Sequence, residues 1–488
     1  MLDRTKSFRF SPLTAKGLHE TIHPTTSFPL IQHVALCFII LCGAASLGSA
    51  QEGPQTLGRP AQQAESKSVN SDTLTLIAPL ISEYVYLVDA AGDIVHQWKF
   101  DVTGSNAYLF PDGTLMRLSQ EPEVDLFDGR GSAGRIQKVD WDGNLIWNFK
   151  YSGKDLLQHH DFELLPNGNV LLIAWERISR DEAVEAGRDP ERLSQNELYS
   201  EKLVEIKPVG KTGGEEVWRW RLWDHLVQNQ DEKLPNFGDP SKTPRRVDIN
   251  YMRNDRADWI HMNAVDYHPG LDQVIMSPRF FDEFWVVDHS TTTEEAMSSK
   301  GGRYGHGGDL LYRCGNPMSY GQGDLNDKIL FGQHNCMWIP ESYPGEGNIT
   351  LFNNGTSEPR TGFSSVDEFR LPLQKDGQYR MLSEFRFESP EVVWSYSRGP
   401  EMYSFRISGA ERLANGNTLV CSGHQAWVLE VAPDKRVVWE NRRKYGGEDG
   451  QTPNKEKGAM FRAPGYTLDY FATEIQAELK GILNRSAQ

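Results

Sequence analysis

Three histidines occupy matching places in a repeated sequence pattern. His160 and His334 each precede a proline by six residues, in HDFELLP and HNCMWIP. When the glycines of the following turns are aligned, His261 falls one residue away from the position of His160. Imidazole exchanges protons near neutral pH, so a set of this kind favours acid–base or nucleophilic chemistry.

Further polar residues follow the same turns. The two strands of an antiparallel hairpin return to one edge of the sheet, so residues that leave a hairpin lie near those that begin it. The predicted rim set adds guanidinium, carboxylate, amide and imidazole groups: Arg279, Arg360, Glu176, Asn354 and His424. Arginine holds oxyanions through paired donors, so the whole set is suited to binding an oxyanion and moving protons.

A metal site is the main alternative for a histidine cluster. The sequence contains no HExxH motif, no paired CxxC and no acidic calcium loop. The glycine-rich segment 301–308 (GGRYGHGG) matches neither a P-loop nor a GxGxxG fingerprint, although Arg303 and His306 within it are candidates for substrate contact. We therefore expect no metal and no cofactor.

The elements that would position these residues are two alternating kinds of hairpin. The first kind ends on a tryptophan, in five clear copies and a degenerate sixth that starts at Phe284: Trp98, Trp147, Trp220, Trp394 and Trp439. The second kind turns at a glycine flanked by period-two apolar alternation, which is typical of β-hairpins. Its five copies span 108–118, 163–173, 265–276, 338–352 and 411–421.

Two hairpins make a four-stranded blade, so six units predict an all-β, six-bladed β-propeller over 72–465 with long inter-strand loops. The missing hairpin strand is expected in TLTLIAPL at 73–80, which would pair with the last unit and close the ring. A pair of two-sheet sandwiches is the alternative. Residues 466–488 are expected to form a C-terminal helix and tail. Histidines at equivalent strand starts would converge near the axis of such a ring.

The chain has 488 residues and a net charge of −16, which argues against a broad basic face for nucleic acid or an acidic membrane. Basic residues, an apolar run at 34–47 and small residues ending at Ala50 predict a signal peptide over 1–50. A polar linker follows at 51–71. We expect a periplasmic or secreted protein without stable membrane insertion after signal removal; an uncleaved anchor is the alternative.

Several long blocks carry a family resemblance. They include TLIAPL with YLVDAAGDIVHQW, HHDFELLPNGNVLLIAWE, DWIHMNAVDYHPGLDQVIMS, VVDHSTTTEEA with GGDLLYRCGNP, QHNCMWIP with LFNNG, and ISGAERLANGNTLVCSG. From about Thr73 to Trp439 the sequence resembles the bacterial arylsulfate sulfotransferases. The resemblance implies a six-bladed propeller that moves a sulfuryl group from a phenolic sulfate ester to a phenol by a ping-pong mechanism through a sulfated histidine, without the nucleotide PAPS.

The resemblance also implies roles for individual residues. His261 in DWIHMN and His334 in QHNC match the family's two supporting histidines, and Arg360 after LFNNG matches its arginine. His424 in CSGHQ is the expected nucleophile. The remaining rim residues are expected to bind substrate: Arg279, His160, Glu176 and Asn354.

Two other functions use the same rim: hydrolysis of a sulfate ester, with water as the acceptor, and ligand binding without catalysis in the cell envelope. The sequence also leaves a homo-oligomer open. Cys314, Cys336 and Cys421 remain after signal removal and allow at most one disulfide.

Overall fold

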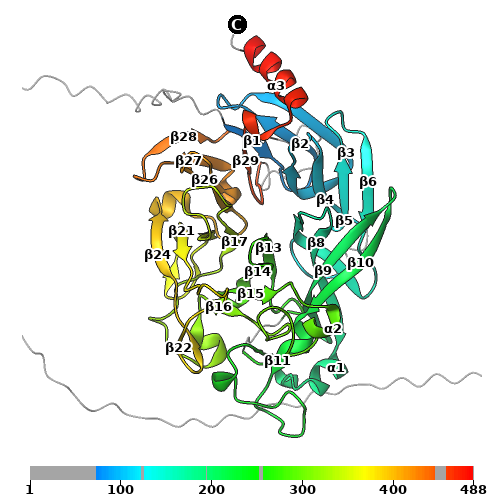
Figure 1. Ribbon diagram of the computed structural model, residues 1–488, viewed down its shortest axis with the longest axis vertical. Coiled ribbons are helices and arrows are strands. Elements are labelled where there is room, and N and C mark those ends of the chain that lie inside the picture. The colour runs from blue at the N-terminus through cyan, green and yellow to red at the C-terminus, as the bar shows by residue number, and fades with distance from the viewer. Residues whose placement is uncertain (1–72, 122–125, 194, 252–255, 446–457, 487–488) are drawn as a thin grey trace, which may run out of the picture. The chain divides into compact units, whose positions relative to one another are not determined.

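The computed structural model describes residues 73–121, 126–193, 195–251, 256–445 and 458–486. All of them belong to one compact unit, Glu65–Gln488. The expected signal peptide and polar linker lie outside the described residues. The described chain is all-β, and curled antiparallel sheets succeed one another around a common centre (Figure 1). Its α-helices are short and peripheral: α1 (Arg180–Glu185), α2 (Thr293–Ala296) and α3 (Thr473–Ser486).

The first sheet has seven strands. In spatial order they are β29 (Gly465–Thr467), β1 (Thr73–Ile77), β2 (Ser82–Val88), β3 (Ile94–Leu109), β4 (Leu115–Gln120), β5 (Gly134–Val139) and β6 (Leu145–Lys150). The long strand β3 pairs with β2 through its first half and with β4 through its second half. Gly104 lies between the two halves, where an added Cβ would approach the Leu118 carbonyl oxygen to 2.2 Å.

Four further sheets have four antiparallel strands each, in spatial order. They are β10 (Gly213–Arg221), β9 (Glu197–Val209), β8 (Val170–Ser179) and β7 (Leu156–Leu164); β13 (Met262–His268), β14 (Gln273–Pro278), β15 (Phe284–Asp288) and β16 (Tyr312–Cys314); β17 (His334–Trp338), β18 (Ile349–Asn353), β21 (Ser365–Arg370) and β24 (Glu391–Tyr396); and β25 (Gly409–Arg412), β26 (Thr418–Ser422), β27 (Trp427–Val431) and β28 (Val437–Asn441).

The loops contain three two-stranded sheets among the described residues. They are β11 (Leu226–Val227) with β12 (Val247–Asp248), β19 (Thr356–Ser357) with β20 (Arg360–Thr361), and β22 (Met381–Ser383) with β23 (Arg386–Phe387).

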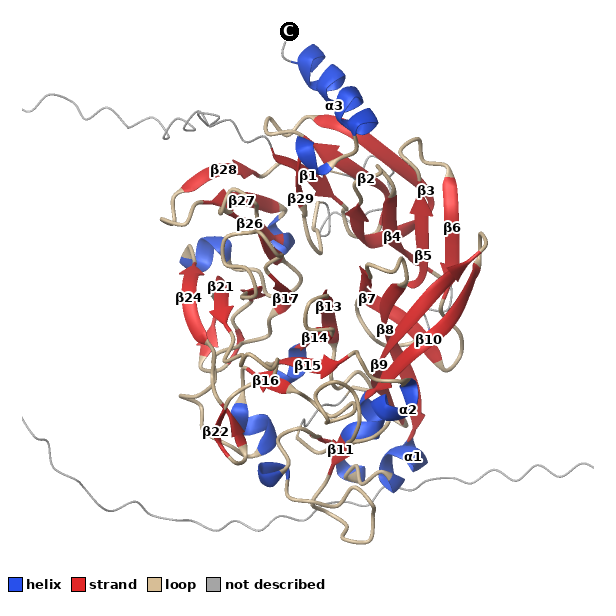
Figure 2. Ribbon diagram, viewed as in Figure 1, coloured by secondary structure: helices blue, strands red, loops and turns tan. Residues whose placement is uncertain are grey.

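In the four-stranded sheets, a hairpin of the second kind supplies the inner strands, and the outer strands follow it in the chain. The inner strands β7, β13 and β17 therefore face the centre (Figure 2).

The two ends of the described chain meet in the first sheet. β1 pairs with β29, with Thr73 opposite Thr467, and with β2 on its other side. The sequence-based expectation that 73–80 would join the last unit is therefore wrong: both terminal strands complete the first sheet. The expected C-terminal helix also starts later, at Thr473, because Gly465–Thr467 is held as a strand by β1.

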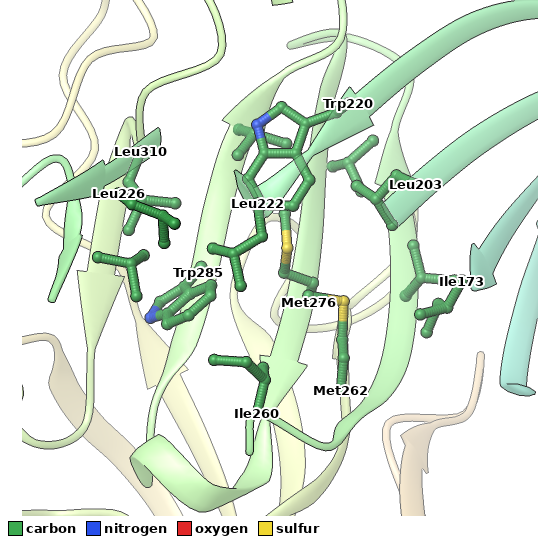
Figure 3. Packing of buried hydrophobic residues seen from close by; sticks show 14 of the residues in the cluster. Ile173, Leu203, Trp220, Leu222, Leu226, Ile260, Met262, Met276, Trp285 and Leu310 are labelled. Carbon is green, nitrogen blue, oxygen red and sulfur yellow. The ribbon is translucent and has the colours of Figure 1, made fainter. Parts of the chain in front are cut away.

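The largest apolar cluster joins the β7–β10 sheet to the β13–β16 sheet (Figure 3). Trp220 and Trp285 are fully buried in it, and the indole nitrogen of Trp220 donates to the Gly308 carbonyl at 2.7 Å. Ile260 and Met262 are also fully buried in this cluster. Burial of each such side chain contributes about 1.5–3 kcal/mol. Because Ile260 and Met262 flank His261, the core fixes the backbone of that histidine.

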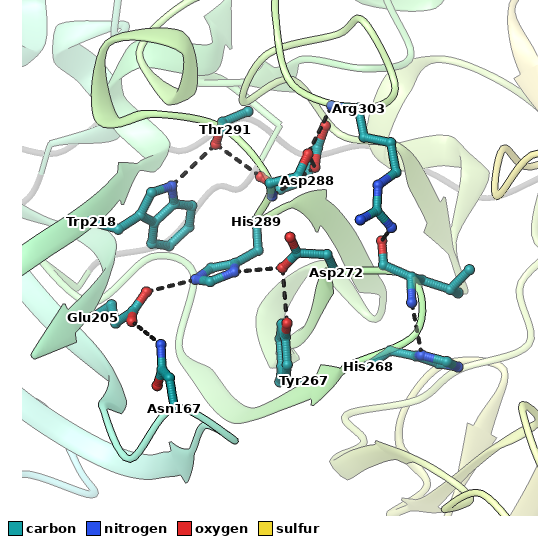
Figure 4. A network of polar contacts seen from close by, with 12 residues as sticks. Asn167, Glu205, Trp218, Tyr267, His268, Asp272, Asp288, His289, Thr291 and Arg303 are labelled. Carbon is teal, nitrogen blue, oxygen red and sulfur yellow. Dashed lines mark hydrogen bonds and ion pairs between the residues drawn. The ribbon is translucent and has the colours of Figure 1, made fainter.

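A polar network joins the same two sheets near the β7–β8 and β13–β14 turns (Figure 4). His289 bonds to Asp272 at 2.8 Å and to Glu205 of β9 at 3.0 Å. Burial alone would lower the pKa of His289, but the bonds to the two carboxylates raise it to about 9. The imidazolium therefore links the sheets as a partly buried ion triad, in which Glu205 is the buried member.

None of the helices within the described ranges combines the length and the apolarity that a membrane crossing requires. Cys314, Cys336 and Cys421 are buried and carry free thiols.

Candidate active site

A pocket of about 560 Å³ lies beside the inner strands, next to the middle of β7, the residue before β13 and the start of β17. Its polar lining consists of Ser105, Asp128, Arg130, His160, Arg256, Asp258, His261, Arg279, His334 and Arg406. Its remaining lining consists of Leu80, Gly131, Phe280, Phe405, Ile407 and Phe461. The volume is within the range of small-molecule sites.

Three neighbouring inner strands bring the histidines together. β13 contacts β7 on one side and β17 on the other. His160 has a φ of 53°, His261 a φ of 57° and Asn335 a φ of 56°. Non-glycine residues adopt this left-handed backbone rarely and at an energetic cost, so it indicates a structural or functional constraint. The pairing of each strand with its neighbour also shifts register nearby.

The backbone revises the alignment of these histidines. By conformation, His261 matches His160 itself, and Asn335 rather than His334 is the third equivalent residue. Counting from the turn glycine misplaced His261 by one residue because Gly270 comes nine residues after His261, whereas Gly168 comes eight residues after His160. The last paired residue of β13 lies seven residues after His261 and that of β7 lies four residues after His160, and the earlier glycine of the β13–β14 turn offsets only part of that difference.

His261 forms a dyad with a buried carboxylate. Its Nδ1 lies 2.5 Å from Oδ2 of Asp258, and the two residues are 8% and 3% exposed. Since a carboxylate accepts hydrogen bonds, Nδ1 carries a hydrogen, and in the neutral form of the ring the lone pair is on Nε2. The ring also contacts Phe280 at 4.9 Å and His160 at 4.6 Å between centroids. This arrangement favours nucleophilic or general-base chemistry at Nε2.

His334 is held on both nitrogens by Asn354 and the backbone. Asn354 donates through Nδ2 to the carbonyls of Ser404 and Ile407, which leaves its Oδ1 to accept from Nδ1 of His334 at 2.7 Å. The Ile407 amide donates to Nε2 of His334 at 3.2 Å. Burial, and then the charge of Arg279, lowers the pKa of His334 well below its usual range. His334 is therefore a neutral wall residue, and Asn354 positions it from behind.

His160 continues inward into a chain of buried groups. Its Nδ1 lies 2.7 Å from Nδ1 of His159, and Nε2 of His159 lies 3.0 Å from Oε2 of Glu201. Burial, followed by the charge of His261, lowers the pKa of His160 well below its usual range. Burial likewise lowers the pKa of His159 to about 3 and, together with Asp258, raises the pKa of Glu201 well above its usual range.

Arginines and aromatic rings complete the pocket. Arg130 and Arg256 are exposed and mark its mouth. Arg279 lies deeper, donates to the Phe405 carbonyl at 3.2 Å, and has its pKa lowered by burial. Four arginines stand against two carboxylates in the lining, so the pocket favours an anion, and its phenyl rings offer faces and edges to an aromatic group.

The structure places four of the expected site residues outside this lining: Asn354, His424, Arg360 and Glu176. Asn354, expected to bind substrate, instead holds His334. The ring of His424 packs edge-on against Phe405, with 4.5 Å between centroids. The guanidinium of Arg360 packs over Phe363, because the β19–β20 hairpin turns it there. The carboxylate of Glu176 is paired with Arg221 at 2.9 Å.

Two loop residues are also placed away from the pocket. Arg303 donates to the carbonyl of Leu271, within the outer network (Figure 4), and His306 is absent from the lining.

Several residues of the site were missed from the sequence. Asp258 could have been identified from the sequence, since it precedes His261 by three residues in the block DWIHMN. Arg130, Arg256 and Arg406 lie in irregular segments without a repeat, and no sequence signal assigned them. Glu201 lies on a strand whose pairing partner decides which face it presents. Among the described residues, no group of three or more potential ligands could hold a metal ion.

Comparison with known proteins identifies a family. The family described as Arylsulfotransferase (ASST) matches residues 61–463, a range that contains every lining residue of the pocket. No curated protein matches the chain.

Solved structures show more distant likenesses. A protein of unknown function from Bacteroides caccae is 9% identical with a TM-score of 0.43, over 81% of this chain and 99% of that one. Virginiamycin B lyase from Staphylococcus aureus is 8% identical with a TM-score of 0.34, over 78% and 87% of the two chains. The periplasmic gluconolactonase PpgL of Pseudomonas aeruginosa is 12% identical with a TM-score of 0.32, over 76% and 96%.

Proposed function

The chain belongs to the arylsulfotransferase family, and from this premise we propose that its pocket transfers a sulfuryl group from a phenolic sulfate ester to a phenol, without PAPS. The observation that carries the proposal is the composition of the pocket. It joins a carboxylate-bound histidine to a deep arginine and to three phenyl rings. An aryl sulfate has the matching parts, an anion attached to an aromatic ring.

Sulfuryl transfer, like phosphoryl transfer, passes through a loose transition state with charge on the peripheral oxygens, so the protein mainly positions groups and offsets charge. Arg279 is the proposed partner of the sulfuryl oxygens. Its backbone amide donates to the His261 carbonyl at 3.2 Å, which ties the arginine to the histidine dyad. Phe280, Phe405 and Phe461 are the proposed contacts of the donor and acceptor rings.

We propose His261 as the histidine that carries the sulfuryl group, in place of His424. Its Nε2 lone pair attacks sulfur, the bond from sulfur to the aryl oxygen breaks, and a phenolate departs. The ring becomes cationic, and the Asp258 carboxylate at 2.5 Å stabilises that charge. In the second half-reaction the acceptor oxygen attacks sulfur, the N–S bond breaks, and Nε2 regains its lone pair.

The test is a two-substrate assay. Incubation of the protein with para-nitrophenyl sulfate and phenol should release nitrophenol and form phenyl sulfate, with no nitrophenol when phenol is omitted. Release at the same rate with and without phenol would instead establish a hydrolase. The absence of turnover with every phenolic acceptor would reject the enzyme.

Two further proposals concern the whole chain. A six-bladed propeller is supported by β3, because division of the seven-stranded sheet at Gly104 gives two four-stranded sheets beside the other four. Export by cleavage near Ala50 is supported by the sequence of residues 1–50. N-terminal sequencing of the exported protein tests it; a mature chain that still begins at Met1 would contradict cleavage.

A further inference from the structure

Three titratable groups form a row that leads from the pocket wall into the protein interior, and the transfer steps above do not use them. His159 and Glu201 are both fully buried, whereas His160 lines the pocket. His159 connects the other two, with 2.7 Å between the two Nδ1 atoms and 3.0 Å to the carboxyl group. The ring of His159 stacks on Trp175 with 4.0 Å between centroids, which keeps it in the protein interior.

The geometry allows only two proton arrangements in a neutral pair of histidines. Two Nδ1 atoms at 2.7 Å need one hydrogen between them, so the tautomers of His159 and His160 are linked. If Glu201 is protonated, it donates to His159, His159 donates to His160, and Nε2 of His160 presents an N–H group to the pocket. If Glu201 is ionised, every donor reverses, and Nε2 of His160 presents a lone pair.

We propose that Glu201, His159 and His160 form a proton relay that protonates the departing phenolate and later takes the proton of the acceptor phenol. The proposal rests on the transferase function above. In the first half-reaction Nε2 of His160 gives its proton to the phenolate oxygen, the proton of His159 moves to Nδ1 of His160, and the Glu201 proton moves to His159. Glu201 is left as a carboxylate. The acceptor phenol returns one proton along the same path.

Other contacts agree with this direction of transfer. The Met262 amide donates to Oε1 of Glu201 at 2.9 Å, so Oε2 is the oxygen that holds the proton. Burial raises the pKa of Glu201 well above its usual range, which favours the protonated acid at rest. The rings of His160 and His261 are 4.6 Å apart, so the proton donor lies beside the proposed sulfuryl carrier.

Gly131 keeps the end of the relay accessible. It lines the pocket, and a Cβ at this residue would lie 2.2 Å from Nε2 of His160. A side chain there would therefore cover the atom that exchanges the proton.

The test is Glu201→Gln with donors of different leaving-group quality. The amide oxygen still accepts from Met262 and the amide nitrogen still donates to His159, but the group cannot release a proton. Nitrophenolate leaves without protonation, whereas phenolate needs an acid. We expect kcat/KM to fall about 10²–10⁴-fold with phenyl sulfate, the usual contribution of a general acid. With para-nitrophenyl sulfate it should fall less than about tenfold.

Glu205→Gln is the matched control, since it removes a buried carboxylate of the same strand that bonds to His289 outside the pocket. It should affect both donors equally. An equal loss with both donors in Glu201→Gln, or no loss, would overturn the relay while wild-type transfer stands. An inactive wild type would reject the transferase function itself.

A measurement on the wild type covers the case in which Glu201→Gln does not fold. NMR of isotopically labelled histidine should show the hydrogen on Nδ1 of His159 and on Nε2 of His160 at neutral pH. The opposite tautomers, with a lone pair on Nε2 of His160, would overturn the proposal.

Discussion

Replacement of Asp258 by asparagine isolates the charge that the mechanism requires beside His261. The carboxylate lies 2.5 Å from Nδ1, and both residues are buried. When Nε2 bonds to sulfur the ring becomes cationic, about 4 Å from the carboxylate charge, which is worth about 4 kcal/mol at an effective dielectric constant near 20. Asparagine still accepts a neutral hydrogen bond worth about 1 kcal/mol. The net loss of roughly 3 kcal/mol predicts a fall in kcat of about 10²-fold.

The assay is nitrophenol release from para-nitrophenyl sulfate with saturating phenol, beside a thermal unfolding curve of each variant. Asp272→Asn is the matched control, because Asp272 also bonds to a histidine, His289, but outside the pocket. The control should keep its kcat and lose stability. If Asp258→Asn keeps kcat within about fivefold of the wild type, the dyad does not stabilise the transition state and the reasoning is refuted.

Three other predictions follow from the structure. His289→Gln should lower the free energy of unfolding by roughly 3 kcal/mol near pH 6, since the pKa of His289 is raised to about 9 and one pKa unit is about 1.4 kcal/mol. The difference between wild type and variant should shrink as the pH rises from 6.5 to 9, because the folded protein then loses the proton of His289. A difference that stays constant with pH in denaturant titrations would contradict this prediction. Arg279→Gln should lower kcat/KM for aryl sulfates by about 10²-fold, from the loss of a charged hydrogen bond to the sulfuryl group, and unchanged steady-state kinetics would exclude that contact. Gly131→Ala should abolish transfer because its Cβ meets His160. Gly143→Ala is the control: Gly143 has a similar positive φ and no atom within 4 Å of an added Cβ, so this variant should keep activity while it loses a comparable amount of stability from backbone strain. Equal activity in the two variants would contradict the blocked pocket.

The repeated hairpins could be predicted because their signals are local. Turn glycines and alternating apolar residues set each strand pair, and Gly168 and Gly416 indeed have φ values of 82° and 85°. The order of the inner strands β7, β13 and β17 then follows from the repeat, which is why the sequence could assign His160, His261 and His334 to one rim. The structure brings these three into one pocket.

The rest depends on contacts that sequence spacing does not encode. Glu201 reaches His159 only through the pairing of β8 with β9 and the face that each strand presents. Arg360 follows the expected motif, but its hairpin packs the guanidinium over Phe363. The terminal strands met in the first sheet rather than the last, because Gly465–Thr467 supplied a partner for β1.

Peptide mapping by mass spectrometry, after exposure of the protein to para-nitrophenyl sulfate without an acceptor, identifies the residue that carries the sulfuryl group. We expect one added sulfuryl group on the peptide that contains His261, removed when phenol is added and absent in His261→Ala. A sulfuryl group on His424, or an unmodified protein during active transfer, would contradict the proposal that His261 carries it.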